Sequence, residues 1–135
     1  MFGTILVLEE RIFLPTPLNR VIVFVGNVEK CARFYQDVFG FAALPSEDPG
    51  WIELDTGGCR LAFHQAHGTK GPIHSPTGGK MNPHKIVFFA EDIAATRATI
   101  VARGGKMGEI RKFGELVFCD GQDPEGHIFQ ISNRT

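Results

Sequence analysis

The sequence predicts an α+β fold made of two similar modules, each consisting of a strand, a helix and three further strands (βαβββ). Two runs, "RVIVFV" (20–25) and "KIVFFA" (85–90), are each followed by the same kinds of residue in the same order. The spacing between matched residues is constant, and the pairs are Arg20 with Lys85, Phe24 with Phe89, Asn27 with Asp92 and Gly40 with Gly105. An internal repeat of this kind indicates a fold more strongly than any single element.

The first module begins with a strand that we expect to be buried on both faces, because "RVIVFV" is rich in β-branched and aromatic residues. Asn27 can N-cap the following helix by accepting a backbone N–H, and Gly40 can end it. The apolar residues between them have the spacing of one helix face: Val28, Cys31, Phe34, Tyr35 and Val38. Three short strands are predicted next, over 41–45, 51–55 and 59–65, separated by turn sequences.

The second module has the same order of elements. The strand "KIVFFA" is followed by Asp92, a second suitable N-cap, and Gly104-Gly105 ends the helix. The apolar residues of that helix are Ile93, Ala94, Ala98, Ile100 and Val101. Strands are predicted near 106–112, 115–120 and 127–132, the last of them after the turn sequence "DPEG".

The chain of 135 residues is expected to form one domain over 20–133, made of modules at about 20–65 and 85–133. Residues 66–84 join the modules. This segment is long and rich in glycine and proline, which predicts a mobile loop beside a cleft between the modules. Residues 1–19 are an N-terminal extension that we expect to add a strand or to pack on a partner chain.

Composition excludes several classes of function. A net charge of −1 does not favour binding to nucleic acid or to an anionic membrane, both of which require a basic surface. The N-terminal apolar run is too short for a signal peptide or a membrane span. Three cysteines at no metal or redox spacing are typical of reduced thiols, so we expect a cytoplasmic protein.

Three segments carry a resemblance to a known family: "RVIVFVGNVEKCARFYQDVFGF", "KIVFFAEDIAATRATIVARGG" and "DPEGHIFQIS". Together they resemble the vicinal-oxygen-chelate superfamily, which includes glyoxalase I, extradiol dioxygenases and bleomycin-resistance proteins. The resemblance implies two βαβββ modules that form a U-shaped cleft, often in a homodimer. In the family's enzymes it also implies one divalent metal on the cleft floor, held by His, Glu or Gln from the first and last strand of each module.

Alternation along the strands shows which residues take those ligand positions here, because residues two apart share a face. The four positions fall on Arg20, Ala62, Lys85 and Gln130. Arg and Lys are cations, and Ala has no donor atom, so only the amide of Gln130 could bind a metal. The expectation is therefore that the cleft holds no metal ion and no other cofactor, and that Gln130 is polar because it faces the cleft.

The five histidines leave a relocated metal site open as an alternative, with the chain then acting as an enzyme. They are His64, His67, His74, His84 and His127. His64 shares the cleft face with Ala62. His67 would face the opposite way on a regular strand, and His127 shares its face with residues that should pack against a helix. Scattered surface and loop histidines are the simpler interpretation.

Arg20 and Lys85 also allow two interpretations. They could approach each other across the pseudo-twofold axis and bind an anionic ligand, with Gln130 and His64 adding hydrogen bonds. Alternatively, an acidic neighbour neutralises each cation; the candidates are Glu53, Asp55, Glu91 and Glu115. The apolar residues on the same faces could line a pocket or could be ordinary core, and these are Ile22, Phe24, Val87 and Phe89.

Two functions follow from these observations. The first is a binding protein that holds a small, partly apolar and anionic molecule in its cleft without a catalytic metal. Its expected ligand-binding residues are Arg20, Ile22, Phe24, His64, Lys85, Val87, Phe89 and Gln130. The second is a metal-dependent lyase of the glyoxalase type, or a dioxygenase, with displaced metal ligands; no catalytic residue is assigned. In either case we expect a homodimer, since pairing would cover exposed sheet edges.

Overall fold

The structure is a computed structural model, and it describes residues 7–8, 11–12, 14–66 and 84–135. The first module contains β3 (Arg20–Val25), α1 (Val28–Phe39), β4 (Ala42–Ala43), β5 (Trp51–Asp55) and β6 (Arg60–Gln65). The second contains β7 (Ile86–Phe89), α2 (Ile93–Ala102), β8 (Lys106–Met107), β9 (Arg111–Phe113), β10 (Leu116–Gln122) and β11 (Ile128–Ser132). The predicted fold of two βαβββ modules is confirmed, with an additional short strand, β9.

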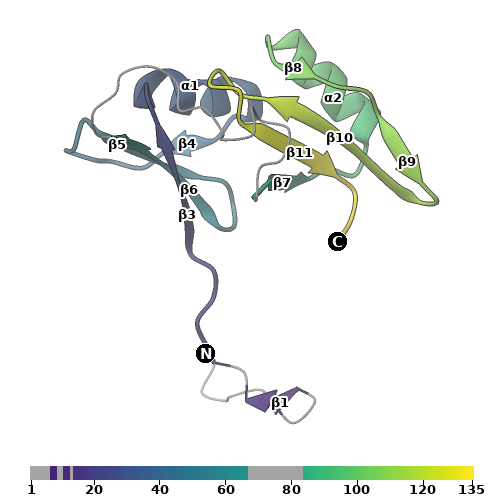
Figure 1. Cartoon of the computed structure of the whole chain (residues 1–135), viewed down its shortest axis with the longest axis horizontal. Coiled ribbons are helices and arrows are strands. Elements are labelled where there is room, and N and C mark those ends of the chain that lie inside the picture. Colours follow the sequence, from purple (N-terminus) through teal and green to yellow (C-terminus); the bar gives the residue numbers. More distant parts are fainter. Residues whose placement is uncertain (1–6, 9–10, 13, 67–83) are drawn as a thin grey trace.

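Each module forms its own sheet, and the two sheets have the same topology. The strand order is β3-β6-β5-β4 in the first and β7-β11-β10-β8 in the second, where β9 also pairs with β10. In both modules the first strand pairs in parallel with the last, β3 with β6 and β7 with β11. The sheets lie side by side, with both helices over the same side of them (Figure 1).

Helix α1 begins and ends where the sequence predicts. The Asn27 side chain accepts the backbone N–H of Lys30 at 3.0 Å, and Gly40 adopts a left-handed conformation with φ of 78°. A residue with a side chain is disfavoured at such a φ, which explains the glycine at this end. The buried face of α1 consists of Val28, Cys31, Ala32, Tyr35 and Val38.

Helix α2 is covered less completely than its apolar sequence suggests. Asp92 caps it by accepting the backbone N–H of Ala95 at 3.0 Å. Ile93 and Ile100 are buried, but Val101 is 46% exposed. No helix in the described parts of the chain is long and apolar enough to cross a membrane.

One hydrophobic core is shared by the two modules. Phe129 of β11 lies against the rings of Phe34, Tyr35 and Phe39 on α1, with ring centroids between 5.4 and 6.1 Å apart. Tyr35 also stacks on Phe63 of β6 at 5.2 Å. Helix α1 therefore packs against strands of both sheets, and burial of these aromatic rings joins the two repeats.

Polar contacts add to this junction. The Glu125 carboxylate, in the turn between β10 and β11, accepts the backbone N–H groups of Gly26 and Asn27 at 2.8 to 3.0 Å. At the other end of α1, Arg103 of the second module donates to the carbonyl oxygen of Val38 at 2.8 Å. The second module thus satisfies backbone groups at both ends of the first module's helix, α1.

The N-terminal extension continues away from the modules (Figure 1). It contains β1 (Val7–Leu8) and β2 (Arg11–Ile12), which pair with each other antiparallel. Leu14 and Leu18, between β2 and β3, are 67% and 75% exposed. Most of the predicted connecting loop, residues 67–83, lies outside the described residues.

Candidate functional site

The face of the first sheet that points away from α1 carries one half of the predicted site. Arg20, Ile22 and Phe24 alternate along β3 on this face. The register places Ala62 of β6 beside Ile22, and Glu53 of β5 beside Ala62. Ile22 and Phe24 are 44% and 54% exposed, so they form an open apolar surface and are not part of the core.

Arg20 is neutralised by Glu53. Its Nε donates to Glu53 Oε2 at 2.9 Å, and Arg60 Nη1 lies 3.5 Å from the same oxygen. Burial by itself would raise the pKa of Glu53, but the hydrogen bond and charge of Arg20, together with Trp51 and Arg60, outweigh burial and lower that pKa. Glu53 is therefore an anion at neutral pH and holds Arg20 in place.

Three rings form an aromatic cluster on the same face. The His64 ring lies between Phe24, at a centroid distance of 5.4 Å, and Trp51, at 5.5 Å. The Arg20 guanidinium carbon is 5.9 Å from the centre of the Trp51 ring. Flat, partly exposed rings next to a cation suit the binding of a planar apolar molecule.

The second sheet presents a corresponding face. Lys85 Nζ lies 3.2 Å from Asp120 Oδ2, and Gln130 Nε2 donates to Asp120 Oδ1 at 3.0 Å. Val87 and Phe89, on the same face of β7, are 53% and 55% exposed. Gln130 is thus polar because it shares the Asp120 carboxylate with Lys85 on this open surface.

The two ion pairs occupy equivalent places in the repeat. In the first module, Glu53 lies opposite Ala62, which lies opposite Ile22. In the second module, Asp120 lies opposite Gln130, which lies opposite Val87. In each module the acid lies on the strand that pairs antiparallel with the last strand: Glu53 on β5 and Asp120 on β10. It forms an ion pair with a cation at the start of the first strand or just before it, Arg20 or Lys85.

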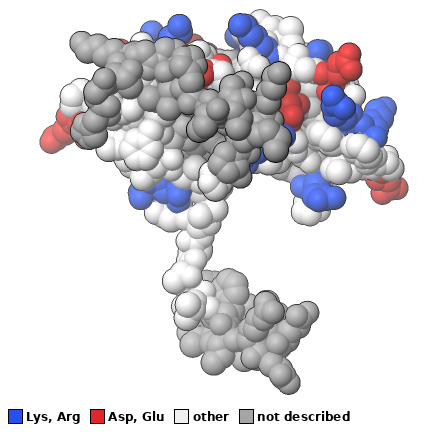
Figure 2. All heavy atoms as spheres, viewed as in Figure 1, with Lys and Arg blue, Asp and Glu red and all other residues white. Residues whose placement is uncertain are grey.

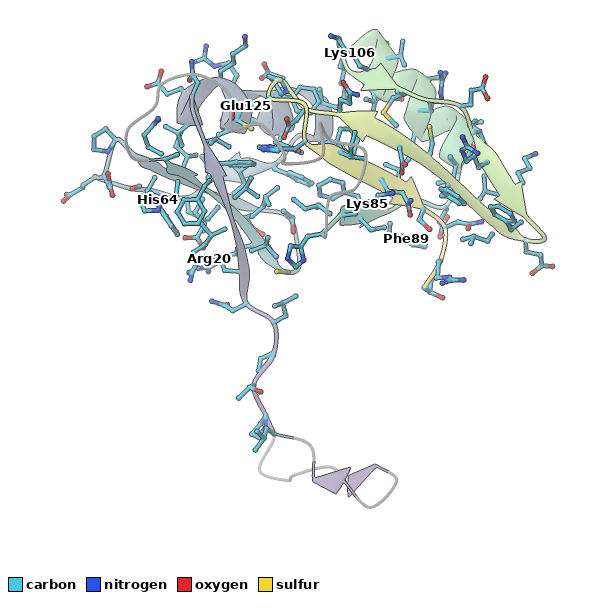
Figure 3. The ribbon with its side chains drawn as sticks, in the orientation of Figure 1. Arg20, His64, Lys85, Phe89, Lys106 and Glu125 are labelled. Atoms are coloured by element: carbon cyan, nitrogen blue, oxygen red, sulfur yellow. The ribbon has the colours of Figure 1, made fainter. Side chains whose placement is uncertain are left out.

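A single chain does not bring the two halves of the predicted site together. Arg20 and His64 lie on one sheet, and Lys85 and Phe89 lie well apart from them on the other (Figure 3). A cavity of about 900 Å³ does lie between the modules, and its lining includes Lys85, Val87 and Phe89 together with Val21, Phe41 and Leu61. Arg20, Ile22, Phe24, His64 and Gln130 are not part of that lining.

The residues at the family's four metal positions do not fit a metal ion. Arg20 and Lys85 are cations engaged in ion pairs, Ala62 has no donor, and the Gln130 amide already donates to Asp120. Among the described residues, the group of three that could hold an ion is Cys31, Asp123 and His127, and it lies on the helix side of the sheets, away from these faces. His67 and His74 lie outside the described residues.

Sequence reasoning missed two members of the site and placed a third only as an alternative. Trp51 and Asp120 were not predicted, and Glu53 was one of several acids that could neutralise a cation. Trp51 and Glu53 are two apart on one strand, so alternation shows that they share a face. Whether Trp51 and Glu53 point to the open face or to the helix side depends on how β5 pairs with β6. The direction of Asp120 likewise depends on how β10 pairs with β11.

Comparison with known proteins agrees with this fold. The model of the Glyoxalase/Bleomycin resistance protein/Dioxygenase superfamily matches residues 17–131, so the chain belongs to that superfamily. A search of curated proteins found no match. The predicted family and fold are therefore both confirmed.

Solved structures with the same fold include proteins of differing description. A glyoxalase/bleomycin resistance protein/dioxygenase family enzyme from Burkholderia phytofirmans PsJN is 20% identical, with a TM-score of 0.67 over 87% of this chain and 98% of that one. TioX from Micromonospora sp. ML1 is 17% identical, with a TM-score of 0.69 over 89% and 100%. Lactoylglutathione lyase from Agrobacterium tumefaciens is 13% identical, with a TM-score of 0.68 over 87% and 93%.

Proposed function

We propose that this protein binds a small, largely planar and apolar molecule on the two open sheet faces, without a catalytic metal. The observation that carries the proposal is the repeated ion pair of Arg20 with Glu53 and Lys85 with Asp120. Its two cations occupy positions at which the family resemblance implies metal ligands. Around these pairs, exposed apolar side chains replace the donors that metal-dependent chemistry needs.

The ion pairs also limit the charge of the ligand. A carboxylate or phosphate would have to compete with Glu53 for Arg20, and Glu53 is nearly buried. Lys85 is more available, because its side chain is 42% exposed and its partner Asp120 is equally accessible. The aromatic cluster of Phe24, Trp51 and His64 is therefore expected to hold the planar body of the ligand. An anionic group on the ligand could use Lys85 of a second copy, if a dimer brings that residue to the cluster.

The test uses Trp51, the single tryptophan of the chain, as a reporter. Planar aromatic carboxylates, phosphates and their uncharged analogues are titrated while Trp51 fluorescence is recorded. A ligand on this face should change the emission, and Phe24→Ala should weaken binding about tenfold or more, because apolar contact area is lost.

Val101→Ala provides the matched control, since Val101 is similarly exposed but lies on α2. Its affinity should equal that of the unmodified protein. If no compound in the panel alters Trp51 emission, or if Phe24→Ala binds as tightly as the unmodified protein, the proposed binding face is wrong.

The alternative is a metal-dependent lyase or dioxygenase with displaced ligands. The donor atoms on the two faces do not favour it, as described above. Metal analysis of protein purified without chelators separates the two functions. Near-stoichiometric iron, manganese, nickel or zinc that is retained when Cys31 is replaced by serine would support the enzyme and contradict the binding protein.

The proposal includes a cytoplasmic homodimer that does not bind nucleic acid. Cys31, Cys59 and Cys119 are free thiols, which supports a reducing compartment. Cationic and anionic side chains are interspersed on the described surface in Figure 2, whereas nucleic-acid binding favours a continuous basic patch. The exposed apolar side chains on β3 and β7 support the dimer.

A further inference from the structure

A buried polar cluster lies at the junction of the modules, on the side of the sheets opposite the proposed binding faces. It consists of Cys31 and Tyr35 from α1, and of Asp123 and His127 from the turn between β10 and β11. Cys31, Tyr35 and Asp123 are almost fully buried, while the His127 side chain is 26% exposed. The ligand-binding function proposed above does not use any of these residues.

One carboxylate oxygen is the centre of the cluster. Asp123 Oδ2 lies 3.6 Å from Cys31 Sγ, 3.1 Å from His127 Nδ1 and 2.9 Å from the Tyr35 hydroxyl. Thiol sulfur, imidazole nitrogen and carboxylate oxygen are the three kinds of atom that bind Zn²⁺ in proteins. All three of these potential ligand atoms lie within 4.8 Å of one another.

The distances are close to those around a bound ion. With ordinary zinc–ligand bond lengths and tetrahedral angles, neighbouring donor atoms are about 3.4 to 3.6 Å apart. The Cys31–Asp123 distance of 3.6 Å and the His127–Asp123 distance of 3.1 Å need little adjustment. The Cys31 sulfur and the His127 nitrogen lie within 4.8 Å of each other, and the partly exposed imidazole can move to adjust that separation.

The charges balance when an ion replaces protons. A neutral thiol, a carboxylate and an imidazolium sum to zero. A thiolate, a carboxylate, a neutral imidazole and a divalent cation also sum to zero, so the ion replaces two protons without adding net charge to a buried site.

The surroundings of the cluster already orient the carboxylate. Asp123 Oδ1 accepts the backbone N–H groups of Glu125 at 2.9 Å and His127 at 3.0 Å, which leaves Oδ2 directed at the other donors. Hydrogen bonds to the ligands from such surrounding groups are a regular feature of metal sites. Three protein ligands leave a fourth position for water or for the Tyr35 oxygen.

We propose that Cys31, Asp123 and His127 bind a divalent cation of the zinc class at the junction of the modules. The thiolate and imidazole favour such an ion over Mg²⁺ and Ca²⁺, which prefer oxygen ligands. The exposed edge of His127 provides the route of entry. Because the ligands come from α1 and from the second module, a bound ion fastens the two modules together.

The experiment uses the full chain, with Co²⁺ as a coloured substitute for Zn²⁺. Titration of the reduced protein should give a sulfur-to-cobalt charge-transfer absorption that saturates at one ion per chain and is displaced by Zn²⁺. Mg²⁺ should leave the spectrum unchanged. In parallel, Zn²⁺ should raise the melting temperature, because an ion that binds only the folded chain stabilises it.

Cys31→Ser tests the assignment, because serine can still donate to Asp123 and should preserve the fold; a circular dichroism spectrum checks this. The variant should lose the charge-transfer absorption and the zinc-dependent rise in melting temperature. Cys59→Ser and Cys119→Ser are matched controls and should keep both. His127→Ala should weaken binding at least tenfold. No charge-transfer absorption in the unmodified protein, or an absorption that persists in Cys31→Ser, overturns the proposal.

Discussion

At the scale of single residues, the two ion pairs of the repeat differ in their surroundings. Glu53 is 8% exposed and accepts from Arg20 at 2.9 Å. Asp120 and Lys85 are each more than 40% exposed in their side chains, with a separation of 3.2 Å. An ion pair that is open to water contributes little to stability, whereas a buried anion that loses its partners is costly.

We therefore expect Glu53→Gln to destabilise the protein by about 1–3 kcal/mol, because a charged hydrogen bond is lost and Arg20 is left without its partner. Asp120→Asn is the matched variant in the second module and should cost less than about 1 kcal/mol. Urea unfolding followed by circular dichroism measures both. Equal losses of unfolding free energy for the two variants would show that the burial of Glu53 does not make its ion pair more important for stability.

The stability provided by Glu53 should also depend on pH. Its folded-state pKa is lowered, so its contribution is present in full above the ordinary value of 4.5 and is lost as pH falls through the folded-state value. The difference in unfolding free energy between the unmodified protein and Glu53→Gln should be constant near neutral pH and shrink below about pH 4.5. A difference that grows on acidification would contradict this assignment.

The sequence predicts which residues of the first strands share a face, but not their partners. Alternation places Arg20 with Phe24 on one face of β3, as the strand shows. It places Lys85 with Phe89 in the same way, although Lys85 precedes β7 in the structure. The acid that pairs with Lys85 is Asp120, which was not among the candidate acids. Contacts along one strand follow from a local period, whereas contacts across strands depend on a register that turns and packing determine together.

At the scale of elements, β10 depends on a glycine inside the strand. A Cβ atom on Gly121 would lie 2.5 Å from the Met107 sulfur and 2.5 Å from a ring carbon of Phe129. Phe129 is fully buried in the shared core, so its ring has little freedom to move. The glycine therefore allows β8 and β11 to pack closely on both sides of β10.

Gly121→Ala should consequently destabilise the protein by about 1–3 kcal/mol, the usual cost of overpacking a core. Gly58→Ala is the matched control, since a Cβ there meets nothing within 4 Å and the backbone is not left-handed. Thermal and urea unfolding of the two variants provides the comparison. If Gly121→Ala were as stable as Gly58→Ala, the Met107 and Phe129 side chains would be able to move aside without any loss of unfolding free energy.

The elements themselves follow from local chemistry. Asn27, Asp92 and Gly40 mark helix ends in the sequence and cap the same helices in the structure. Apolar content did not predict how well α2 is covered, because Val101 is as apolar as Ile100 yet is half-exposed. Burial depends on what another element places against the helix, and that is a property of the assembled modules.

At the scale of the whole molecule, the first strand of each module has an exposed apolar face. Within the described part of the chain, β3 pairs with β6 and β7 pairs with β11, and neither pairs on its other edge. Ile22, Phe24, Val87 and Phe89, on these strands, are each at least 44% exposed. An exposed apolar surface of this kind is typical of a protein–protein interface. A second copy of the chain bound there could also bring the two halves of the ligand site together.

We therefore propose a twofold-symmetric homodimer. Sedimentation of the unmodified protein at micromolar concentration should give the mass of two chains, and Phe89→Glu should shift it towards one, because a charge would be buried at the interface. Val101→Glu, on the exposed face of α2, should leave the mass unchanged. An unmodified protein that sediments as a single chain would end this proposal.

The contacts between the modules have a consequence for how the chain unfolds. Glu125 of the second module holds the backbone where α1 begins, and Phe129 fills the aromatic core around Tyr35. The first module therefore depends on the second for partners at both ends of α1, and the two modules share one aromatic core. Although the sequence contains two copies of one pattern, we therefore expect the chain to unfold as one cooperative unit, and the first module alone would lack the partners that the second supplies.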